Sequence, residues 1–186
     1  MMNILRILLA ATVCALTWPV VAQDTNSLKT RIGTFEARTG VVIVKGINPV
    51  GTIPLGAAEL SVGCKQTRDL ASGEKMYGFI IEVEGPKLTP ESVLVDDDEA
   101  GPLLNAVRTL GKINNELTTL SGFAASYTTK AGLCVTAESV RKDGAVQNYL
   151  KIEPYPPLAL TPVQMTQFAN LLQEGRENLD VLKVGK

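Results

Sequence analysis

Histidine is absent from this chain of 186 residues, and cysteine and the aromatic side chains are scarce. There are three cysteines, one tryptophan and an aromatic content of 5%. Without histidine the chain has no Ser-His-Asp triad, no Cys-His pair and no imidazole ligand for a metal. Histidine is also the usual general base near neutral pH. The composition therefore favours a non-catalytic protein. An enzyme of this composition would need carboxylates, a Ser-Lys pair or a bound hard metal ion for its chemistry.

The first 22 residues have the pattern of a secretory signal peptide. Arg6 gives a positive start, an apolar run extends from Ile7 to Trp18, and Val20-Val21-Ala22 has the small residues of a cleavage site. The run is too short for a membrane-spanning helix. We therefore expect cleavage before Gln23, export to the periplasm or the extracellular medium, and no stable membrane insertion once the leader is removed.

Charge and length limit the partners and the number of domains. Loss of Arg6 with the leader changes the formal net charge from −1 to −2, which creates no field that would gather nucleic acid or anionic lipid. We expect a flexible N-terminus over residues 23–30, one α+β domain over 31–182 and a C-terminal tail over 183–186. No nucleic-acid partner is expected, whereas a protein partner is compatible with this balance.

Alternating and β-branched segments predict seven strands, at residues 31–38, 41–45, 57–68, 76–84, 123–130, 133–141 and 145–152. Two segments rich in proline or glycine predict loops, at residues 48–56 and 85–90. Residues 98–117 carry apolar side chains at helical spacing. A second helix should begin after Thr161, a threonine cap followed by Pro162 and Gln164, and end near Gly175.

These segments predict an α+β fold with a mainly antiparallel sheet of about seven strands and two helices, in the order ββββαβββα. The residues that enter the two helices are similar, Val93-Leu94-Val95-Asp96 and Leu158-Ala159-Leu160-Thr161. The apolar stripes of the helices then align at one constant offset. The pattern indicates two half-repeats, each a meander closed by a helix.

Two cysteines remain after leader removal, and the residues leave their pairing open. An oxidising compartment favours a disulfide between Cys64 and Cys134. Strand alternation places Cys64 with the apolar set and Cys134 opposite the apolar set. Cysteines on opposite faces of one sheet cannot form a bridge, whereas cysteines of two different sheets, or of a sheet in which one strand is bulged, can.

The densest charge in the chain is the acidic run Asp96, Asp97, Asp98 and Glu99. Four carboxylates could hold calcium or magnesium, although the spacing is not that of an EF-hand loop. The competing interpretation is that these acids lie at the positive end of a helix dipole and that one of them caps the helix. The run is therefore the candidate site of an alternative function, a carboxylate- or metal-dependent hydrolase. No cofactor is predicted.

Three other motifs have weaker implications. Ser72 and Lys75 have the Ser-x-x-Lys spacing of serine acyl-enzymes, but they fall in a predicted hairpin turn. Pro154-Tyr155-Pro156-Pro157 has the composition of a rigid linker or of an extended segment that partner domains bind. Tyr77 follows the core alternation, and Tyr149 lies on the outward face.

Three stretches of the chain form a recognisable set: Phe35-Glu36-Ala37-Arg38-Thr39-Gly40-Val41 through Gly46, the acidic run, and Phe123 through Leu133. In this order they resemble an uncharacterised family of small bacterial and plastid-associated proteins. The resemblance departs at Asp97, where the Asp-Tyr-Asp-Glu-like helix entry of the family has an aromatic residue, and in the C-terminal third of the chain. It implies one domain and no particular activity, because no activity is known for the family.

The sequence as a whole favours an exported binding or scaffolding domain that does not catalyse a reaction. The hydrolase centred on residues 96–99 is the alternative. Single-stranded nucleic-acid binding is the least favoured function, because it requires exposed aromatic residues interleaved with Lys and Arg.

Overall fold

The chain folds into two consecutive units of four strands and one helix, which follow a short first helix. The computed structural model describes residues 29–86, 88–114, 122–139, 145–151 and 157–184. The first helix is α1 (Arg31–Glu36). The first unit comprises β1 (Ile43–Leu55), β2 (Ala58–Asp69), β3 (Lys75–Gly85), β4 (Leu88–Asp96) and α2 (Asp97–Leu110). The second unit comprises β5 (Ala124–Thr128), β6 (Cys134–Ser139), β7 (Val146–Lys151), β8 (Leu158–Leu160) and α3 (Pro162–Val184).

Each unit forms its own antiparallel sheet, and the strands of each sheet lie in sequence order. The predicted α+β class is confirmed. The predicted single sheet of about seven strands is replaced by two sheets of four. Two strands were not predicted, β4 and β8, which the sequence showed only as the entries to the two long helices; they pair with β3 and β7. One of the seven predicted strands, over residues 31–38, is absent.

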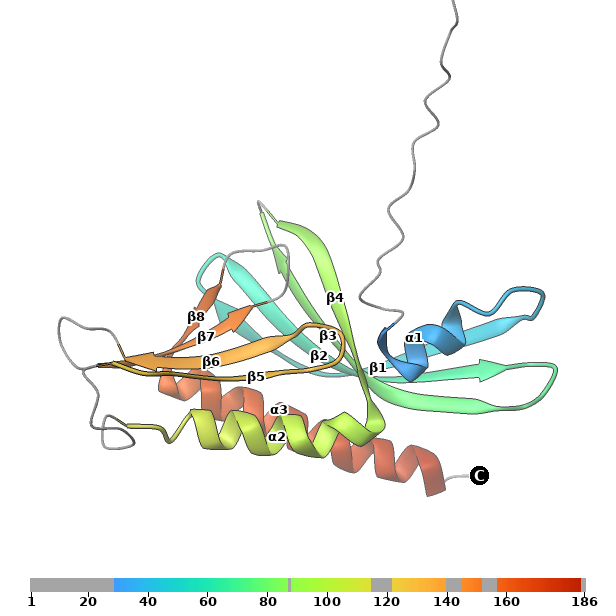
Figure 1. The fold of residues 1–186 in the computed structure, drawn as a ribbon. Helices are drawn as coiled ribbons and strands as arrows, with labels where there is room; N and C mark the ends of the chain where they lie inside the picture. The colour runs from blue at the N-terminus through green and yellow to red at the C-terminus, as the bar shows by residue number, and fades with distance from the viewer. Residues whose placement is uncertain (1–28, 87, 115–121, 140–144, 152–156, 185–186) are drawn as a thin grey trace, which may run out of the picture.

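One hydrophobic core joins the two units. In Figure 1, α2 and α3 lie side by side and cover one face of the first sheet, with the second sheet also packed on them. The core combines side chains from both sheets and both long helices, among them the fully buried Phe79, Leu103, Val135 and Phe168. Among the described residues, no helix is long and apolar enough to cross a membrane.

The first helix replaces the strand that was predicted over residues 31–38. Thr30 caps α1, because its Oγ1 accepts a hydrogen bond from the Gly33 N–H at 3.0 Å. Ile32 is buried and packs with Ile80 and Leu94 on the face of the first sheet opposite α2 and α3. The strand prediction, which followed the β-branched residues, was wrong. In so short a segment tertiary contacts outweigh the weak intrinsic preference of these residues for a strand.

Strand β1 replaces the loop that was predicted over residues 48–56. It is the end strand of its sheet and, among the strands that the structure describes, pairs only with β2. The register shifts between Pro49 and Gly51, which marks a bulge. Proline is tolerated at the edge of a sheet, where its missing N–H need not pair with a neighbour. The second predicted loop, over residues 85–90, is also shorter than expected, since β4 begins at Leu88.

The capping box predicted at the second long helix is confirmed. Thr161 Oγ1 accepts from the Gln164 N–H at 3.2 Å, and Gln164 Oε1 accepts from the Thr161 N–H at 2.8 Å. The helix does not end at Gly175, as the sequence suggested, but continues to Val184. Gly175 is there for close packing: a Cβ at this position would lie 2.8 Å from the ring of Phe79. Lys183, assigned to the tail, thus lies in the helix.

The other long helix, α2, begins at Asp97, and its predicted apolar stripe is buried. Leu103, Val107 and Leu110 all face the core. The helix ends at Leu110, earlier than predicted, and residues 115–117 of the predicted helix lie outside the described residues. Tyr77 packs against the same core, as its alternation predicted.

Candidate functional site

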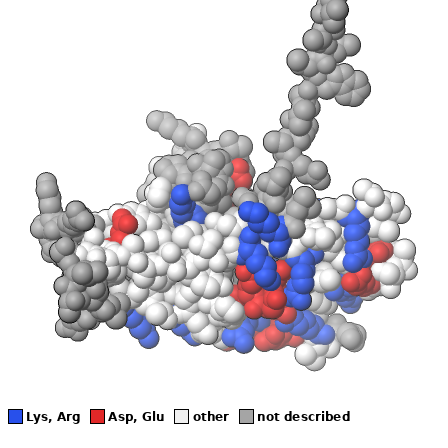
Figure 2. All heavy atoms as spheres, in the orientation of Figure 1, with Lys and Arg blue, Asp and Glu red and all other residues white. Residues whose placement is uncertain are grey.

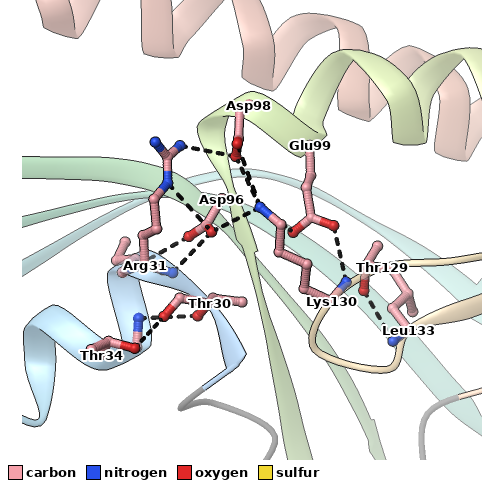
Figure 3. Close-up of polar contacts among 11 residues, drawn as sticks. Thr30, Arg31, Thr34, Asp96, Asp98, Glu99, Thr129, Lys130 and Leu133 are labelled. Carbon is pink, nitrogen blue, oxygen red and sulfur yellow. Dashed lines mark hydrogen bonds and ion pairs between the residues drawn. The ribbon is translucent and has the colours of Figure 1, made fainter.

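The acidic run lies where β4 passes into α2, and its first member binds a different helix. Asp96 occupies the N-cap position of α2, but its side chain makes no capping hydrogen bond there. Its carboxylate instead accepts from the backbone N–H groups of Arg31 and Ile32, at 2.9 and 3.0 Å (Figure 3). The residue is 1% exposed. Asp96 therefore caps α1 across the molecule, which corrects the expectation that the run caps its own helix.

The ammonium group of Lys130 lies among the carboxylates of Asp96, Asp98 and Glu99 (Figure 3). Its Nζ is 3.4 Å from Asp96 and from Asp98 and 3.9 Å from Glu99, and its backbone N–H donates to Glu99 Oε1 at 2.9 Å. Burial lowers the pKa of Lys130, but the nearby carboxylates of Glu99, Asp98 and Asp96 outweigh burial, so that the net pKa is raised. The lysine therefore stays charged and ties the β5–β6 turn to the start of α2.

The remaining member of the run, Asp97, is also paired. It accepts a hydrogen bond from Lys183 near the end of α3. Arg31 adds an ion pair with Asp98 at 2.9 Å. Figure 2 shows the result: much of the visible face carries no charge, and acidic and basic atoms gather where α1 and the start of α2 meet. The run joins α1, the β5–β6 turn and α3, and this is a structural role.

These contacts bear directly on the hydrolase alternative. The ammonium of Lys130 occupies the position between Asp96, Asp98 and Glu99 that a cation would need. In the part of the chain that the structure describes, no group of three or more acidic or cysteine side chains is placed to hold a metal ion. A metal would have to displace Lys130 and break the contacts between α2 and the β5–β6 turn.

The two cysteines are free and lie on different sheets. Cys64 on β2 is 1% exposed and its Sγ donates to the Gly175 carbonyl at 3.1 Å. Burial, with a contribution from the Glu174 carboxylate, raises the pKa of the Cys64 thiol to about 11. Cys134 is half-buried on the face of β6 opposite the buried Val135 and Ala137. The structure therefore has no disulfide between them.

The structure describes two of the three weaker motifs in full and part of the third. Ser72 lies in the β2–β3 turn, where its hydroxyl accepts from the Glu74 N–H, so it does not open a helix as an acyl-enzyme serine would. Tyr149 lies on the outward face of the second sheet, and its hydroxyl donates to Gln147. Residues 154–156 of the proline-rich segment lie outside the described residues.

A second candidate site lies along the outer side of β1. We call residues 42–47 the open edge. The Leu70 N–H donates to the Val42 carbonyl, which fixes the alternation of the ladder with β2. In an antiparallel pair every second residue directs both backbone groups away from its neighbour. The register then directs the N–H and C=O groups of Ile43, Lys45 and Ile47 outward, where no described strand pairs with them.

The other half of β1 is protected. The same alternation directs the nitrogens of Pro49 and Pro54 outward, and proline has no N–H to offer. The Pro54 carbonyl accepts from Gln164 of α3 at 2.6 Å. Prolines, a bulge and a covering helix are the usual means by which proteins block an edge. Only the first half of the strand lacks them.

Apolar side chains gather at this unprotected half. Val42 is 63% exposed, Val44 47% and Ile47 55%. Val41 and Leu70 add to the same end of the sheet, so that five of the eight exposed large hydrophobic residues of the described chain lie there. An exposed edge with apolar side chains is a template for strand addition by another chain.

One charged cluster borders the open edge on the face that α1 covers. Lys45 Nζ and Lys65 Nζ both bind the Glu36 carboxylate, at 2.8 and 2.9 Å, and Thr67 donates to the same carboxylate at 2.7 Å. Lys65 is buried and the Glu36 side chain is 9% exposed, whereas the Lys45 side chain is 50% exposed. Two ammonium groups share one carboxylate, so the cluster carries a net positive charge at the edge.

The sequence predicted a strand at residues 41–45 but did not identify it as an edge. The signal was present in Pro49 and Pro54, because prolines within a β-pattern are typical of edge strands. Comparison with known proteins adds no constraint on either candidate site: no protein-family model, curated protein or solved structure matches the chain.

Proposed function

We propose that the protein is an exported, non-catalytic binding domain and that it binds an extended protein segment along the open edge of β1. The proposal depends on the exposed apolar edge at residues 42–47, whose outward backbone groups have no partner strand among the described residues. An added strand would pair with Ile43, Lys45 and Ile47 through main-chain hydrogen bonds and would cover Val44.

The acidic run supports the non-catalytic part of the proposal. Asp96, Asp97, Asp98 and Glu99 are all engaged by groups of α1, the β5–β6 turn or α3. A catalytic carboxylate must reach its substrate, and here each such group already holds two elements together. The absence of histidine points in the same direction.

Site-specific photo-crosslinking, with the whole chain expressed and then exported, tests the proposal. A photoreactive residue at Val44 should give adducts, whereas one at Val163, which is exposed on α3 away from the edge, should not. Ile47→Pro removes one outward N–H and should abolish the adducts. Ile47→Ala keeps that N–H and should retain most of them, since main-chain bonds dominate strand addition.

Two results would contradict the proposal. Adducts that survive Ile47→Pro in a folded variant would place the contact elsewhere than on the main chain of β1. Turnover of an ester, peptide or glycan substrate that is lost in Asp98→Asn would mean that the acidic run is catalytic.

A further inference from the structure

We infer that the segment bound at the open edge has an acidic residue opposite Lys45 with an apolar residue two positions away on each side. This inference rests on the proposed function and names the chemistry of its ligand. The side chains of Ile43, Lys45 and Ile47 lie on the same face of β1, because every second residue of a strand points to the same side. Directly opposed side chains of neighbouring strands contact each other, so the incoming strand must complement this apolar, basic, apolar order.

The charge of the site selects an acid at the central position. Lys45 and Lys65 share the single carboxylate of Glu36, and only Lys45 is exposed to an incoming side chain. A carboxylate opposite Lys45 would complete the cluster as two cations and two anions. A basic side chain in that place would add a third cation and be repelled.

The same lysine disfavours a second copy of this chain as the occupant. Antiparallel pairing of two open edges in the register that matches Ile43 with Ile47 of the other copy places the two Lys45 side chains opposite each other. Shifting the register by one pair puts Lys45 against an isoleucine and loses the apolar match. A lysine on an edge strand is a common means of preventing self-pairing.

Binding of short peptides to the chain that begins at Gln23 tests the inference. The probe is Ser-Val-Thr-Glu-Thr-Val-Ser, whose symmetric order places Glu opposite Lys45 and the two valines opposite Ile43 and Ile47 in an antiparallel pair. The matched peptides have Lys or Gln in place of Glu, and a fourth is N-methylated at both valines. Affinity is measured by titration of the backbone NMR signals of residues 42–47.

We expect the Glu peptide to bind at least tenfold more tightly than the Lys peptide, with the Gln peptide between them. Lys45→Gln should reduce this preference to less than threefold, while a control variant, Lys75→Gln, should leave it unchanged. N-methylation should abolish binding, because the methyl groups block the main-chain hydrogen bonds to β1.

The outcomes separate this inference from the proposed function. Equal binding of the Glu and Lys peptides, lost on N-methylation, would overturn the acidic preference and leave strand addition intact. No binding of the Glu peptide would overturn the inference, whatever the crosslinking from Val44 shows. A dimer in sedimentation that dissociates in Ile47→Pro would also overturn it, because a second copy would then be the occupant.

Discussion

The Asp96 carboxylate accepts a hydrogen bond from the Ile32 backbone N–H, 64 positions earlier in the chain, at 3.0 Å. The bond is buried, and a second one from the Arg31 N–H accompanies it. It attaches α1 to the face of the first sheet that α2 and α3 leave uncovered. The acidic run is thus explained by tertiary contacts of its members more than by the dipole of the helix that it begins.

Asp96→Asn should therefore destabilise the protein more than any other single amide substitution in the run. The amide keeps one acceptor but turns a donor toward a backbone N–H, so we expect a loss of about 1–3 kcal/mol in the free energy of unfolding. Asp98→Asn, at a side chain that is 53% exposed, should cost less than about 1 kcal/mol. Urea unfolding of both variants measures the difference. Equal losses would contradict the role of Asp96 as the cap of α1.

Two helical glycines should differ in how much stability they lose on substitution by alanine. At Gly175 the new methyl group would lie 2.8 Å from the Phe79 ring, and overpacking of this kind costs about 1–3 kcal/mol. At Gly101 the nearest atoms of other segments belong to the end of the Arg176 side chain, 3.6 Å away, but Pro102 follows, and its ring disfavours the helical conformation of a preceding residue that has a Cβ. This clash offsets the gain in helix propensity, so Gly101→Ala should change the free energy of unfolding by less than about 1 kcal/mol. Thermal melts of the two variants provide the measurement. Stabilisation by Gly175→Ala would show that α3 and β3 are less closely packed than described.

The two cysteines should differ in reactivity and should not form a disulfide. Cys64 is buried with a pKa of about 11, so the reactive thiolate is scarce at neutral pH. Cys134 is half-buried and open to solvent on the outward face. Iodoacetamide should modify Cys134 in the native protein and reach Cys64 only after unfolding. Mass spectrometry after mild oxidation should show both thiols intact, and a Cys64–Cys134 bridge would contradict the placement of the two strands.

Glu36 makes the stability of the edge depend on pH. Burial raises its pKa, but hydrogen bonds from Lys45, Lys65 and Thr67 outweigh burial and hold the pKa below its ordinary value of 4.5. A lowered pKa contributes stability that is present above 4.5 and lost as the pH falls through the folded-state value. The Glu36→Gln variant should therefore have a lower free energy of unfolding than the parent near neutral pH. This difference in free energy should become smaller in acid, where Glu36 of the parent is protonated. Glu74→Gln, at an exposed ion pair with Arg38, is the control and should show little difference at any pH.

Local patterns in the sequence predicted the elements that are held together by local interactions. The alternation of residues 57–68 and 76–84 predicted β2 and β3, because apolar side chains recur every second residue on the face that the long helices cover. The middle of each strand is buried on the opposite face as well. The capping box at Thr161 predicted the start of α3, because both of its hydrogen bonds lie within four residues. Such signals need no knowledge of the tertiary fold.

The sequence-based prediction missed the elements that depend on contacts with residues far away in the sequence. Helix α1 is too short to be stable alone and needs Asp96 from β4, which no local pattern reveals. The second half of β1 looks like a loop until the strand is known to be an edge that tolerates Pro49 and Pro54. The end of α3 was placed too early because the contact between Gly175 and Phe79 joins two distant segments. The open edge was missed for the same reason, since an edge is a property of the whole sheet.

Amide hydrogen exchange along β1 tests the central claim most directly. In the protein alone, the outward amides of Ile43, Lys45 and Ile47 should exchange rapidly, while those of Val44 and Gly46, bonded to β2, should exchange slowly. The Glu-centred peptide should slow the three outward amides and leave the second sheet unchanged. Outward amides that already exchange slowly without a ligand, or peptide protection confined to other elements, would contradict the account.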